Sequence, residues 1–510
     1  ADNLNNSRGD LIGCMSAITG KTFTEGDVEV SEAIDFCRFY PVAMMTFDKL
    51  KTVTNRPKGI ILVIPPWNFP TAIPVGGVAS ALAGGNTVIL KPATVAFPVA
   101  WEFAKCFWDA GVPKDALQLV CPEERNAVNY LTAHPSVKHI ILTGGTDTAF
   151  SILENNPACP LSAETGGKNA IILTASGDRD HAIQNVVKSA FSNAGQKCSA
   201  CSLLLLEKSV FDDPSFKVKL IDAVTSMHTG SAWDGGNIVG PMVTNTNDKL
   251  LHAIDNLEEG ESWLVKPEFV DEQRYILKPS VKWGVKPDSF TFKNELFGPL
   301  LAVVCMENLK HGIDLVNSGE YGLTSGLQSL DESEIDLWKN KIDAGNLYIN
   351  RGITGAIVQR QPFGGMKRSA FGGGIKAGSE NYVSCFVNFA ETNHTENAVS
   401  NENKFEKGHP YCPPVYGNET CNTTEIKEIL EVLVPVTVAP EVEVGNAAVT
   451  VVGEPCVRPL PCSSLSRNGI CKFLVTQKLC VQVPITFNAT ARANEGLSTD
   501  CFENRCPRQY

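Results

Sequence analysis

The chain has 510 residues and a mass of 55.0 kDa, with 43% hydrophobic and 20% charged residues. This length predicts more than one domain, because single hydrophobic cores stop growing at roughly 250–300 residues. The net charge of −12, from 44 basic and 56 acidic residues, argues against nucleic acid or an anionic membrane surface as a partner.

One uncharged stretch, residues 59–90, is long enough on paper to cross a bilayer. A spanning helix needs a largely apolar sequence whose backbone hydrogen bonds are all satisfied. We expect no membrane span, but buried strands, a loop and a core helix, because the stretch is interrupted by Pro65, Pro66, Pro70, Pro74, Gly76, Gly77, Gly84 and Gly85.

In chain order, four apolar runs predict strands at Gly59–Ile64, Thr87–Leu90, Ala116–Val120 and His139–Leu142. Helical patterns lie between them at Thr71–Leu82, Phe97–Ala110 and Glu124–Ala133. Strands that alternate with helices predict a parallel, doubly wound α/β sheet. Such sheets bind ligands beyond the carboxyl ends of their strands, which indicates a nucleotide site.

A second segment continues the alternation, with strands at Asn169–Leu173 and Ser202–Leu206 and a helix at His181–Asn193 between them. Cys198 lies in the turn before the second strand. It can be a small buried hydrophobe, half of a redox or metal pair with Cys201, or a catalytic nucleophile. A zinc site needs four ligands, and no second closely spaced cysteine pair precedes residue 392, so we expect no metal.

Five motifs occur in order along about 300 residues: Pro66-Trp-Asn-Phe-Pro70, Glu164-Thr-Gly-Gly-Lys168, Gly195-Gln-Lys-Cys198, Glu295-Leu-Phe-Gly-Pro299 and Pro362-Phe-Gly-Gly365. Over residues 7–391 the chain resembles the NAD(P)-dependent aldehyde dehydrogenase superfamily. Within it, the chain looks like the 1-pyrroline-5-carboxylate dehydrogenases, in particular the dehydrogenase half of bifunctional proline utilization A enzymes. The resemblance favours the nucleophile interpretation of Cys198.

The resemblance implies that Cys198 attacks the aldehyde carbonyl and later carries a thioester, which requires a thiolate and therefore a lowered pKa. The side-chain amide of Asn68 and the backbone N–H of Cys198 then stabilise the oxyanion. Glu164 matches the general base that activates water for hydrolysis of the thioester.

The resemblance also implies a cofactor site. Lys91 matches the lysine that binds the adenosine ribose, Glu295 matches the carboxylate on the nicotinamide ribose, and Phe297 and Trp67 flank that site. Gly144 and Gly145 precede a helix whose N-terminus can face the pyrophosphate. The expected cofactor is NAD, but NADP stays open because Thr94 stands where many relatives have a glutamate that repels a 2′-phosphate.

For the substrate, Ser199 and the backbone N–H groups of Gly355 and Ala356 match the family clamp for an α-carboxylate. The implied reaction is oxidation of L-glutamate γ-semialdehyde, the open form of 1-pyrroline-5-carboxylate, to L-glutamate in proline catabolism. Two alternatives stay open: a generic aldehyde dehydrogenase, and an inactive dehydrogenase-like body within a binding or structural fusion protein.

The implied organisation is a nucleotide-binding domain at 1–163, shortened at its N-terminus relative to the family, and an α/β catalytic domain at 164–365. Strands at 366–391 resemble the family's oligomerisation strands, so we expect a homo-oligomer. The nine cysteines before residue 400 are scattered, which is typical of a cytoplasmic protein.

The remaining chain has a different composition. A polar linker at 392–411 precedes a cysteine-rich module at 412–510, where β-branched runs predict an all-β structure. Three glycosylation sequons, at Asn418, Asn422 and Asn488, would suit an extracytoplasmic or envelope context. The eight cysteines of this part allow 105 disulfide pairings, and they are Cys412, Cys421, Cys456, Cys462, Cys471, Cys480, Cys501 and Cys506.

Overall fold

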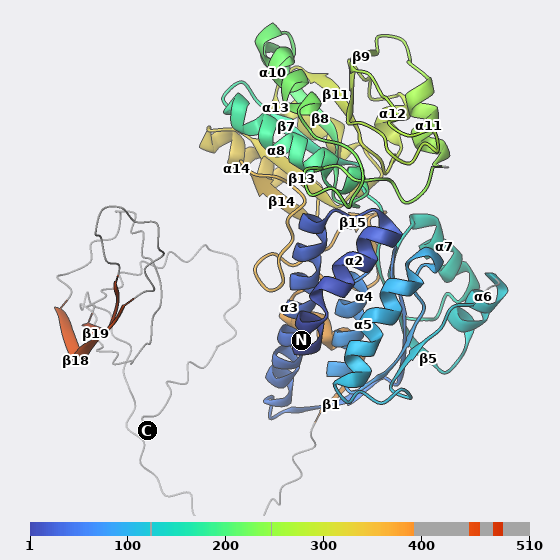
Figure 1. Cartoon of the computed structure of the whole chain (residues 1–510), viewed down its shortest axis with the longest axis vertical. Helices are drawn as coiled ribbons and strands as arrows, with labels where there is room; N and C mark the ends of the chain where they lie inside the picture. The colour runs from blue at the N-terminus through green and yellow to red at the C-terminus, as the bar shows by residue number, and fades with distance from the viewer. Residues whose placement is uncertain (123–124, 246, 392–447, 460–472, 483–510) are drawn as a thin grey trace, which may run out of the picture. The chain divides into compact units, whose positions relative to one another are not determined.

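The computed structural model describes residues 1–122, 125–245, 247–391, 448–459 and 473–482 (Figure 1). The chain divides into two compact units, Ala1–Asn397 and Ala398–Tyr510. In the described part of the second unit, β18 (Ala448–Pro459) and β19 (Phe473–Gln482) form an antiparallel pair. The predicted linker, and the sequons and most cysteines of the predicted module, lie outside the described residues.

The first unit contains a six-stranded sheet and a seven-stranded sheet. The six-stranded sheet has the order β16 (Ala370–Phe371), β6 (Leu161–Glu164), β5 (Val137–Thr143), β2 (Ile60–Ile64), β3 (Thr87–Leu90) and β4 (Leu117–Leu119). Its strands are parallel except β16, which runs antiparallel to β6. The predicted parallel sheet is therefore confirmed, and residues 59–90 fold as strand, helix and strand.

Helices cover both faces of this sheet. Residues alternate along β2, so that Ile61 and Val63 join the core under α4, whereas Leu62 and Ile64 face the side of α6 and α7. This alternation produces the doubly wound arrangement. The helices of this part are α1 (Asp2–Asn6), α2 (Arg8–Thr19), α3 (Phe23–Asp48), α4 (Ala72–Ala83), α5 (Phe97–Asp109), α6 (Arg125–Ala133) and α7 (Thr146–Asn155).

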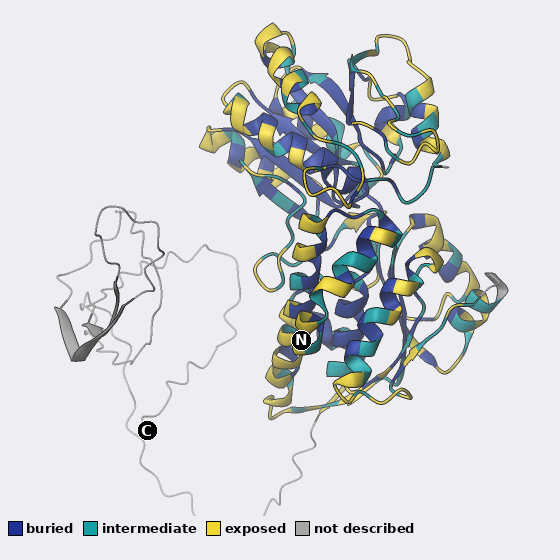
Figure 2. Cartoon of the chain, viewed as in Figure 1, coloured by how far each residue is buried: buried dark blue, intermediate teal, exposed yellow. Residues whose placement is uncertain are grey.

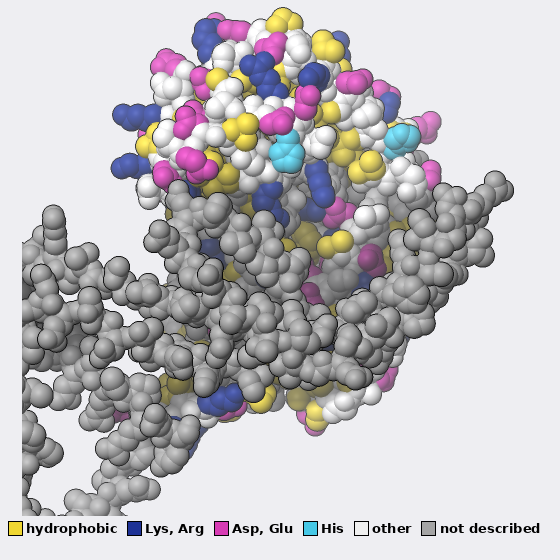
Figure 3. Space-filling view, turned by 90° about the vertical axis from the view of Figure 1, so that its left-hand side faces the viewer, with side chains coloured by type: hydrophobic (Ala, Val, Ile, Leu, Met, Phe, Trp, Pro, Cys, Tyr) yellow, Lys and Arg dark blue, Asp and Glu magenta, His cyan; other side chains and the backbone are white. Residues whose placement is uncertain are grey.

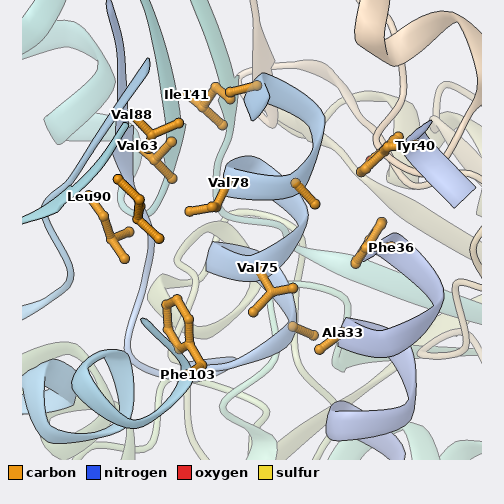
Figure 4. Packing of buried hydrophobic residues seen from close by; sticks show 14 of the residues in the cluster. Ala33, Phe36, Tyr40, Val63, Val75, Val78, Val88, Leu90, Phe103 and Ile141 are labelled. Carbon is orange, nitrogen blue, oxygen red and sulfur yellow. The ribbon is translucent and has the colours of Figure 1, made fainter. Parts of the chain in front are cut away.

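Helix α4 lies between α3 and the sheet, with Val78 facing the strand residue Val63 (Figure 4). Two glycines allow this close approach. A Cβ on Gly76 would lie 3.1 Å from the ring of Phe36, and one on Gly77 would lie 2.9 Å from Val63. Glycines therefore fix how near α3 and β2 come to the two sides of α4.

The seven-stranded sheet has the order β14 (Asn346–Ile349), β13 (Thr324–Gln328), β7 (Asn169–Leu173), β8 (Cys201–Glu207), β11 (Leu300–Met306), β10 (Ser280–Trp283) and β9 (Ser262–Val265). All neighbours are parallel except β9 and β10. The helices that accompany it are α8 (Arg179–Phe191), α9 (Lys208–Phe211), α10 (Pro214–Thr225), α11 (Asp248–Asp255), α12 (Phe290–Lys293), α13 (Leu309–Asn317) and α14 (Glu332–Lys341).

The buried residues of both sheets form continuous cores, with the exposed residues on the outer faces of the helices (Figure 2). Along β7, Ile171 and Leu173 pack with α8, while Ala170 and Ile172 pack with α13 and α14. Within the described residues, no helix combines the length and the apolar character that a membrane crossing requires.

Three short pairings involve the predicted oligomerisation segment, 366–391. The strand β15 (Met366–Lys367) pairs with β12 (Tyr321–Gly322), β16 pairs with β6, and β17 (Val387–Glu391) pairs with β1 (Val53–Pro57). The 3₁₀ helix η3 (Glu380–Phe386) precedes β17, and η1 (Thr94–Ala96) precedes α5. The domain limits at 163, 365, 391 and 411 stay predictions, as does pairing with a second copy of the chain.

Candidate active site

Several residues of the predicted ligand site lie at the carboxyl ends of β3, β5 and β6. Strand register places the end of β2 beside the ends of β3 and β5, and pairs Thr143 with Glu164. Lys91 follows β3 and is half-buried, and this burial lowers the pKa of its ammonium group. Gly145 is the N-cap of α7 and has no side chain to cap the first N–H groups of that helix. Anion-binding donors and a cation therefore follow β5 and β3, the two strands that flank β2.

The turn that carries Cys198 has a strained backbone. Asn193, Ala194 and Gly195, which lie within or at the end of η2 (Ser192–Gly195), have φ angles of 52°, 53° and 68°. Left-handed conformations cost free energy at residues with a side chain, and they persist only where the surroundings enforce them. At Gly195 a Cβ would overlap the carbonyl of Gly298, so only glycine fits there. The strain fixes the position from which the chain enters the cysteine turn.

Asn169, at the start of β7, holds the other side of this turn. Its side-chain Nδ2 donates hydrogen bonds to the carbonyl oxygens of Cys198 at 2.6 Å and Ala200 at 3.0 Å. Its Oδ1 accepts a hydrogen bond of 3.0 Å from the backbone N–H of Thr324 on β13. Asn169 is 2% exposed, so these bonds form away from water. One amide therefore ties the cysteine turn to two neighbouring strands.

Five predicted residues line one cavity of about 190 Å³. The partly exposed Cys198 is there with Glu164, which ends β6. The residues predicted to bind the substrate carboxylate, Ser199, Gly355 and Ala356, line the same cavity. The structure thus brings the predicted nucleophile, base and carboxylate clamp together.

Asn68 lies beside the cysteine turn. It is 5% exposed, and its Nδ2 donates a hydrogen bond of 2.9 Å to the carbonyl of Gln196, two residues before Cys198. This bond orients the amide next to the turn, although Asn68 is not among the residues that line the cavity.

The electrostatic environment of Cys198 differs from the one expected for the nucleophile. Burial raises the pKa of Cys198 to about 12, and the carboxylates of Glu295 and Glu164 raise it further. The expected lowered pKa is therefore wrong for this conformation, because burial and the two carboxylates outweigh the backbone hydrogen bonds that lower it. Burial also raises the pKa of Glu164 to about 8, although the Lys376 ammonium opposes this shift. A thiol and a carboxyl group of unusually high proton affinity thus face one cavity.

The predicted nicotinamide-side residues form a second cluster on the other side of the turn. Glu295 Oε1 accepts a hydrogen bond of 2.8 Å from the N–H of Gly167, and burial raises the pKa of this carboxyl to about 7. Phe297 has a positive φ of 51°, and its ring contacts Trp67 edge to face with centroids 5.5 Å apart. Glu295, Phe297 and Trp67 therefore lie close to Gly167 and to the cysteine turn.

Several polar residues of the site were missed from the sequence. Lys197, directly before the nucleophile, pairs with Glu25 of α3 at 2.6 Å. Burial alone would raise the pKa of Glu25, but the ammonium groups of Lys197, Lys21 and Lys188 together outweigh it and lower this pKa. Lys168, within a recognised motif, donates a hydrogen bond of 2.6 Å to Ser202. Lys197 and Lys168 lie within sequence motifs, so their positions were a usable signal. Glu25 lies in no motif.

The structure does not favour the alternative of a cysteine pair with Cys201. Cys201 begins β8, is 1% exposed and belongs to the hydrophobic core of the seven-stranded sheet. Both cysteines are free thiols. Cys198 therefore faces the cavity without a sulfur partner.

A family model described as "Aldehyde dehydrogenase family" matches residues 1–391. The chain belongs to the aldehyde dehydrogenase family. Among its relatives is 1-pyrroline-5-carboxylate dehydrogenase of Geobacillus thermodenitrificans, 33% identical over 386 residues, which cover 71% of this chain and 74% of the relative.

Solved structures of this family show the same fold. Proline utilization A from Corynebacterium freiburgense matches with a TM-score of 0.75 and 43% identity over 78% of this chain, which spans only 41% of that longer protein. A 1-pyrroline-5-carboxylate dehydrogenase from Thermus with bound NAD matches with a TM-score of 0.71 and 30% identity, covering 77% of this chain and 79% of that one.

The residues of this aldehyde dehydrogenase fit a dinucleotide. The uncapped N-terminus of α7 offers N–H groups to a pyrophosphate, and Lys91 offers a cation close to the same sheet edge. Glu295 offers a carboxylate that can accept hydrogen bonds from ribose hydroxyls. A dinucleotide site built on these groups would end near the cysteine turn.

Proposed function

We propose that residues 1–391 oxidise L-glutamate γ-semialdehyde, formed from 1-pyrroline-5-carboxylate, to L-glutamate as a step of proline catabolism. The observation that carries the proposal is the shared cavity of Cys198, Glu164, Ser199, Gly355 and Ala356. In this cavity a thiol and a carboxyl group lie together with backbone groups that can bind a carboxylate, which supports the proposal. The relatives named 1-pyrroline-5-carboxylate dehydrogenase support this choice of substrate.

In the proposed mechanism, Cys198 Sγ bonds to the aldehyde carbon after its proton has left. Burial and the negative charges of Glu295 and Glu164 raise the pKa of this thiol, so a base must take its proton before the attack. The Asn68 amide and the Cys198 N–H would stabilise the oxyanion, an effect whose loss costs about 3 kcal/mol in comparable sites. NAD, or NADP, would supply the hydride acceptor when bound.

Hydrolysis then releases the acid. Glu164 takes a proton from water as the water oxygen bonds to the thioester carbon and the C–S bond breaks, leaving the electron pair on Cys198. The carboxyl lies in the same cavity as the sulfur, and its raised pKa makes it a stronger base than an ordinary glutamate once it is ionised. Its position favours the role of general base.

The test is NADH formation with NAD and 1-pyrroline-5-carboxylate. We expect Cys198→Ala to lower kcat/KM by at least about 10³-fold, because the covalent route is removed. The matched control is Cys121→Ala at an exposed thiol, which should keep native activity. Equal rates for the native protein and Cys198→Ala would contradict an enzyme of this mechanism and favour an inactive dehydrogenase-like body.

A second assay separates the proposed substrate from a generic aldehyde. A neutral aldehyde of similar length lacks the carboxylate that the Gly355–Ala356 loop would bind. We expect its kcat/KM to be about 10²-fold lower, since unpaired donors in the loop would stay unsatisfied. Equal kcat/KM values for both substrates would contradict the carboxylate clamp.

We also propose that the dehydrogenase acts in the cytoplasm as a homo-oligomer on a small-molecule substrate. The nine cysteines before residue 392 are free thiols, as is usual in reducing compartments. The part of the catalytic region in view in Figure 3 intermixes basic and acidic side chains, unlike a nucleic-acid-binding face. Gel filtration with light scattering checks the oligomeric state, and a single-chain mass would contradict it.

A further inference from the structure

A thin wall of chain separates the cavity of Cys198 from a second, more open cleft. Ala377 and Gly378 line the cavity, whereas the flanking residues Lys376 and Ser379 line the cleft. Gln361 lines both. The cleft has a volume of about 680 Å³, so solvent and small solutes have room on its side of the wall.

Glu164 and Lys376 face each other across this wall. Among the described residues, Glu164 Oε2 is buried and has no hydrogen-bond partner. Gly364 separates the two side chains, because a Cβ there would lie 3.4 Å from Glu164 Oε1 and 2.8 Å from Lys376 Cγ. Any larger residue would push the lysine stem away from the carboxyl.

Lys376 itself is held in place. Its Nζ donates a hydrogen bond to the carbonyl of Gly345, at the start of the segment that leads into β14. Burial lowers the pKa of this ammonium, and the Glu164 carboxylate opposes this shift. The charge is therefore anchored on the cleft side, near enough to interact electrostatically with Glu164.

The other titratable groups that act with Glu164 are neutral. Tyr40, Tyr382 and Cys198 each have a pKa raised by burial first and by Glu164 in addition. Among the described residues, Lys376 is the cation whose charge opposes the effect of burial on Glu164.

We propose that Lys376 is a positioning residue for thioester hydrolysis, whose ammonium group stabilises the carboxylate form of Glu164 from the open cleft. This arrangement keeps the cation out of the cavity, where it would attract the substrate carboxylate to the wrong place. The proposal rests on the proposed role of Glu164 as general base, but not on which aldehyde is oxidised.

The test isolates the hydrolytic step. An activated ester, p-nitrophenyl acetate, acetylates Cys198 without cofactor or aldehyde, and intact-protein mass spectrometry then follows loss of the acetyl group between pH 6 and 9.5. In Lys376→Met we expect the midpoint of this pH profile to rise by about one unit, with about tenfold slower loss at pH 7. Lys376→Arg keeps a charge and should keep the native midpoint. Lys310→Met, at an exposed lysine of α13, is the matched control.

Rescue tests the cleft directly. In Lys376→Ala, methylammonium added at millimolar concentration should enter the cleft and restore part of the lost rate, with no effect on the native protein. A native midpoint in Lys376→Met would overturn the proposal, as would absence of rescue in a folded Lys376→Ala. If the acetyl group is lost normally but 1-pyrroline-5-carboxylate is not oxidised, the proposed substrate fails while the role of Lys376 stands.

Discussion

The two sheets of the first unit hold their site residues in opposite ways. In the six-stranded sheet, Lys91, Gly144 and Glu164 lie at or directly after the ends of regular parallel strands. In the seven-stranded sheet, Cys198 follows a turn with consecutive left-handed residues, clamped by Asn169. Strand ends are sufficient to position groups that bind a ligand. The nucleophile must in addition be held in a defined geometry relative to the carbon atom that it attacks.

The difference predicts where substitutions act. Changes at the strand ends should alter binding or chemistry and leave the fold intact. Changes at the clamped turn should alter stability and chemistry together, because the same hydrogen bonds support both. Substitutions at Glu164, Asn169 and Thr94 test this contrast, and one at Glu29 compares it with a buried ion pair of α3.

Glu164→Gln should separate hydride transfer from hydrolysis. Turnover should fall by about 10²–10⁴-fold, since the amide cannot accept the proton of water, while a first burst of NADH of one equivalent per site is kept. The native rate of hydrolysis should rise with pH up to about 8, because Glu164 works deprotonated and its pKa is raised to about 8. Stopped-flow absorbance measures both phases.

Glu154→Gln, at an exposed position of α7, is the control and should match the native protein. A variant that loses the burst together with turnover would assign Glu164 to an earlier step than hydrolysis.

Glu29→Gln should destabilise the nucleotide-binding part without touching the nucleophile. Glu29 and Lys21 form an ion pair whose side chains are fully buried. Glu29 Oε1 also accepts hydrogen bonds from the N–H groups of Thr71 at 2.7 Å and Ala72 at 3.1 Å, at the start of α4. Glutamine keeps an acceptor but leaves the Lys21 charge unpaired, which costs about 3–5 kcal/mol in buried pairs.

Urea denaturation followed by circular dichroism checks this value. The control is Asp27→Asn, which breaks the exposed Arg8–Asp27 pair of 2.6 Å and should cost less than about 1 kcal/mol. Equal losses for both substitutions would show that burial of the pair does not govern its contribution.

The regular parts of both sheets could be predicted from the sequence. The strands at Thr87–Leu90 and Asn169–Leu173 have the predicted limits, because continuous β-branched and leucine runs mark strands buried on both faces. Of the site, five of the predicted residues share one cavity because motif residues follow strand ends or turns. The short strand β16 was missed, since two residues carry no readable period.

Other features depend on contacts between distant residues. Helix α3 runs through Pro41, where local rules end a helix, and continues because Tyr40, Ala43 and Met44 are buried in the core. The clamp of Asn169 on Cys198 and the approach of Lys376 to Glu164 join residues on different elements. The raised pKa of Cys198 follows from burial, which the sequence around a cysteine does not report.

Asn169→Ala should lower stability and activity together. The substitution removes three hydrogen bonds and leaves the buried carbonyls of Cys198 and Ala200 without this donor. We expect a loss of about 3 kcal/mol in the free energy of unfolding and a fall in kcat of about tenfold, as the turn loses its position. Asn308→Ala, which removes the N-cap bond of α13 to His311, should cost about 1 kcal/mol and leave kcat unchanged. A stable Asn169→Ala with native kcat would refute the coupling.

Thr94→Glu should have the smallest effect, confined to cofactor choice. Thr94 is exposed in η1, three residues after Lys91. A carboxylate there would repel a 2′-phosphate and can accept hydrogen bonds from a ribose hydroxyl, so KM for NADP should rise about five- to tenfold while KM for NAD stays or falls slightly. Thr94→Gln has the same size without the charge and should change neither value by more than about twofold. Because the position lies after a regular strand end, stability should not change; a rise in both KM values would mean that the loop, and not the charge, sets cofactor affinity at this edge of the sheet.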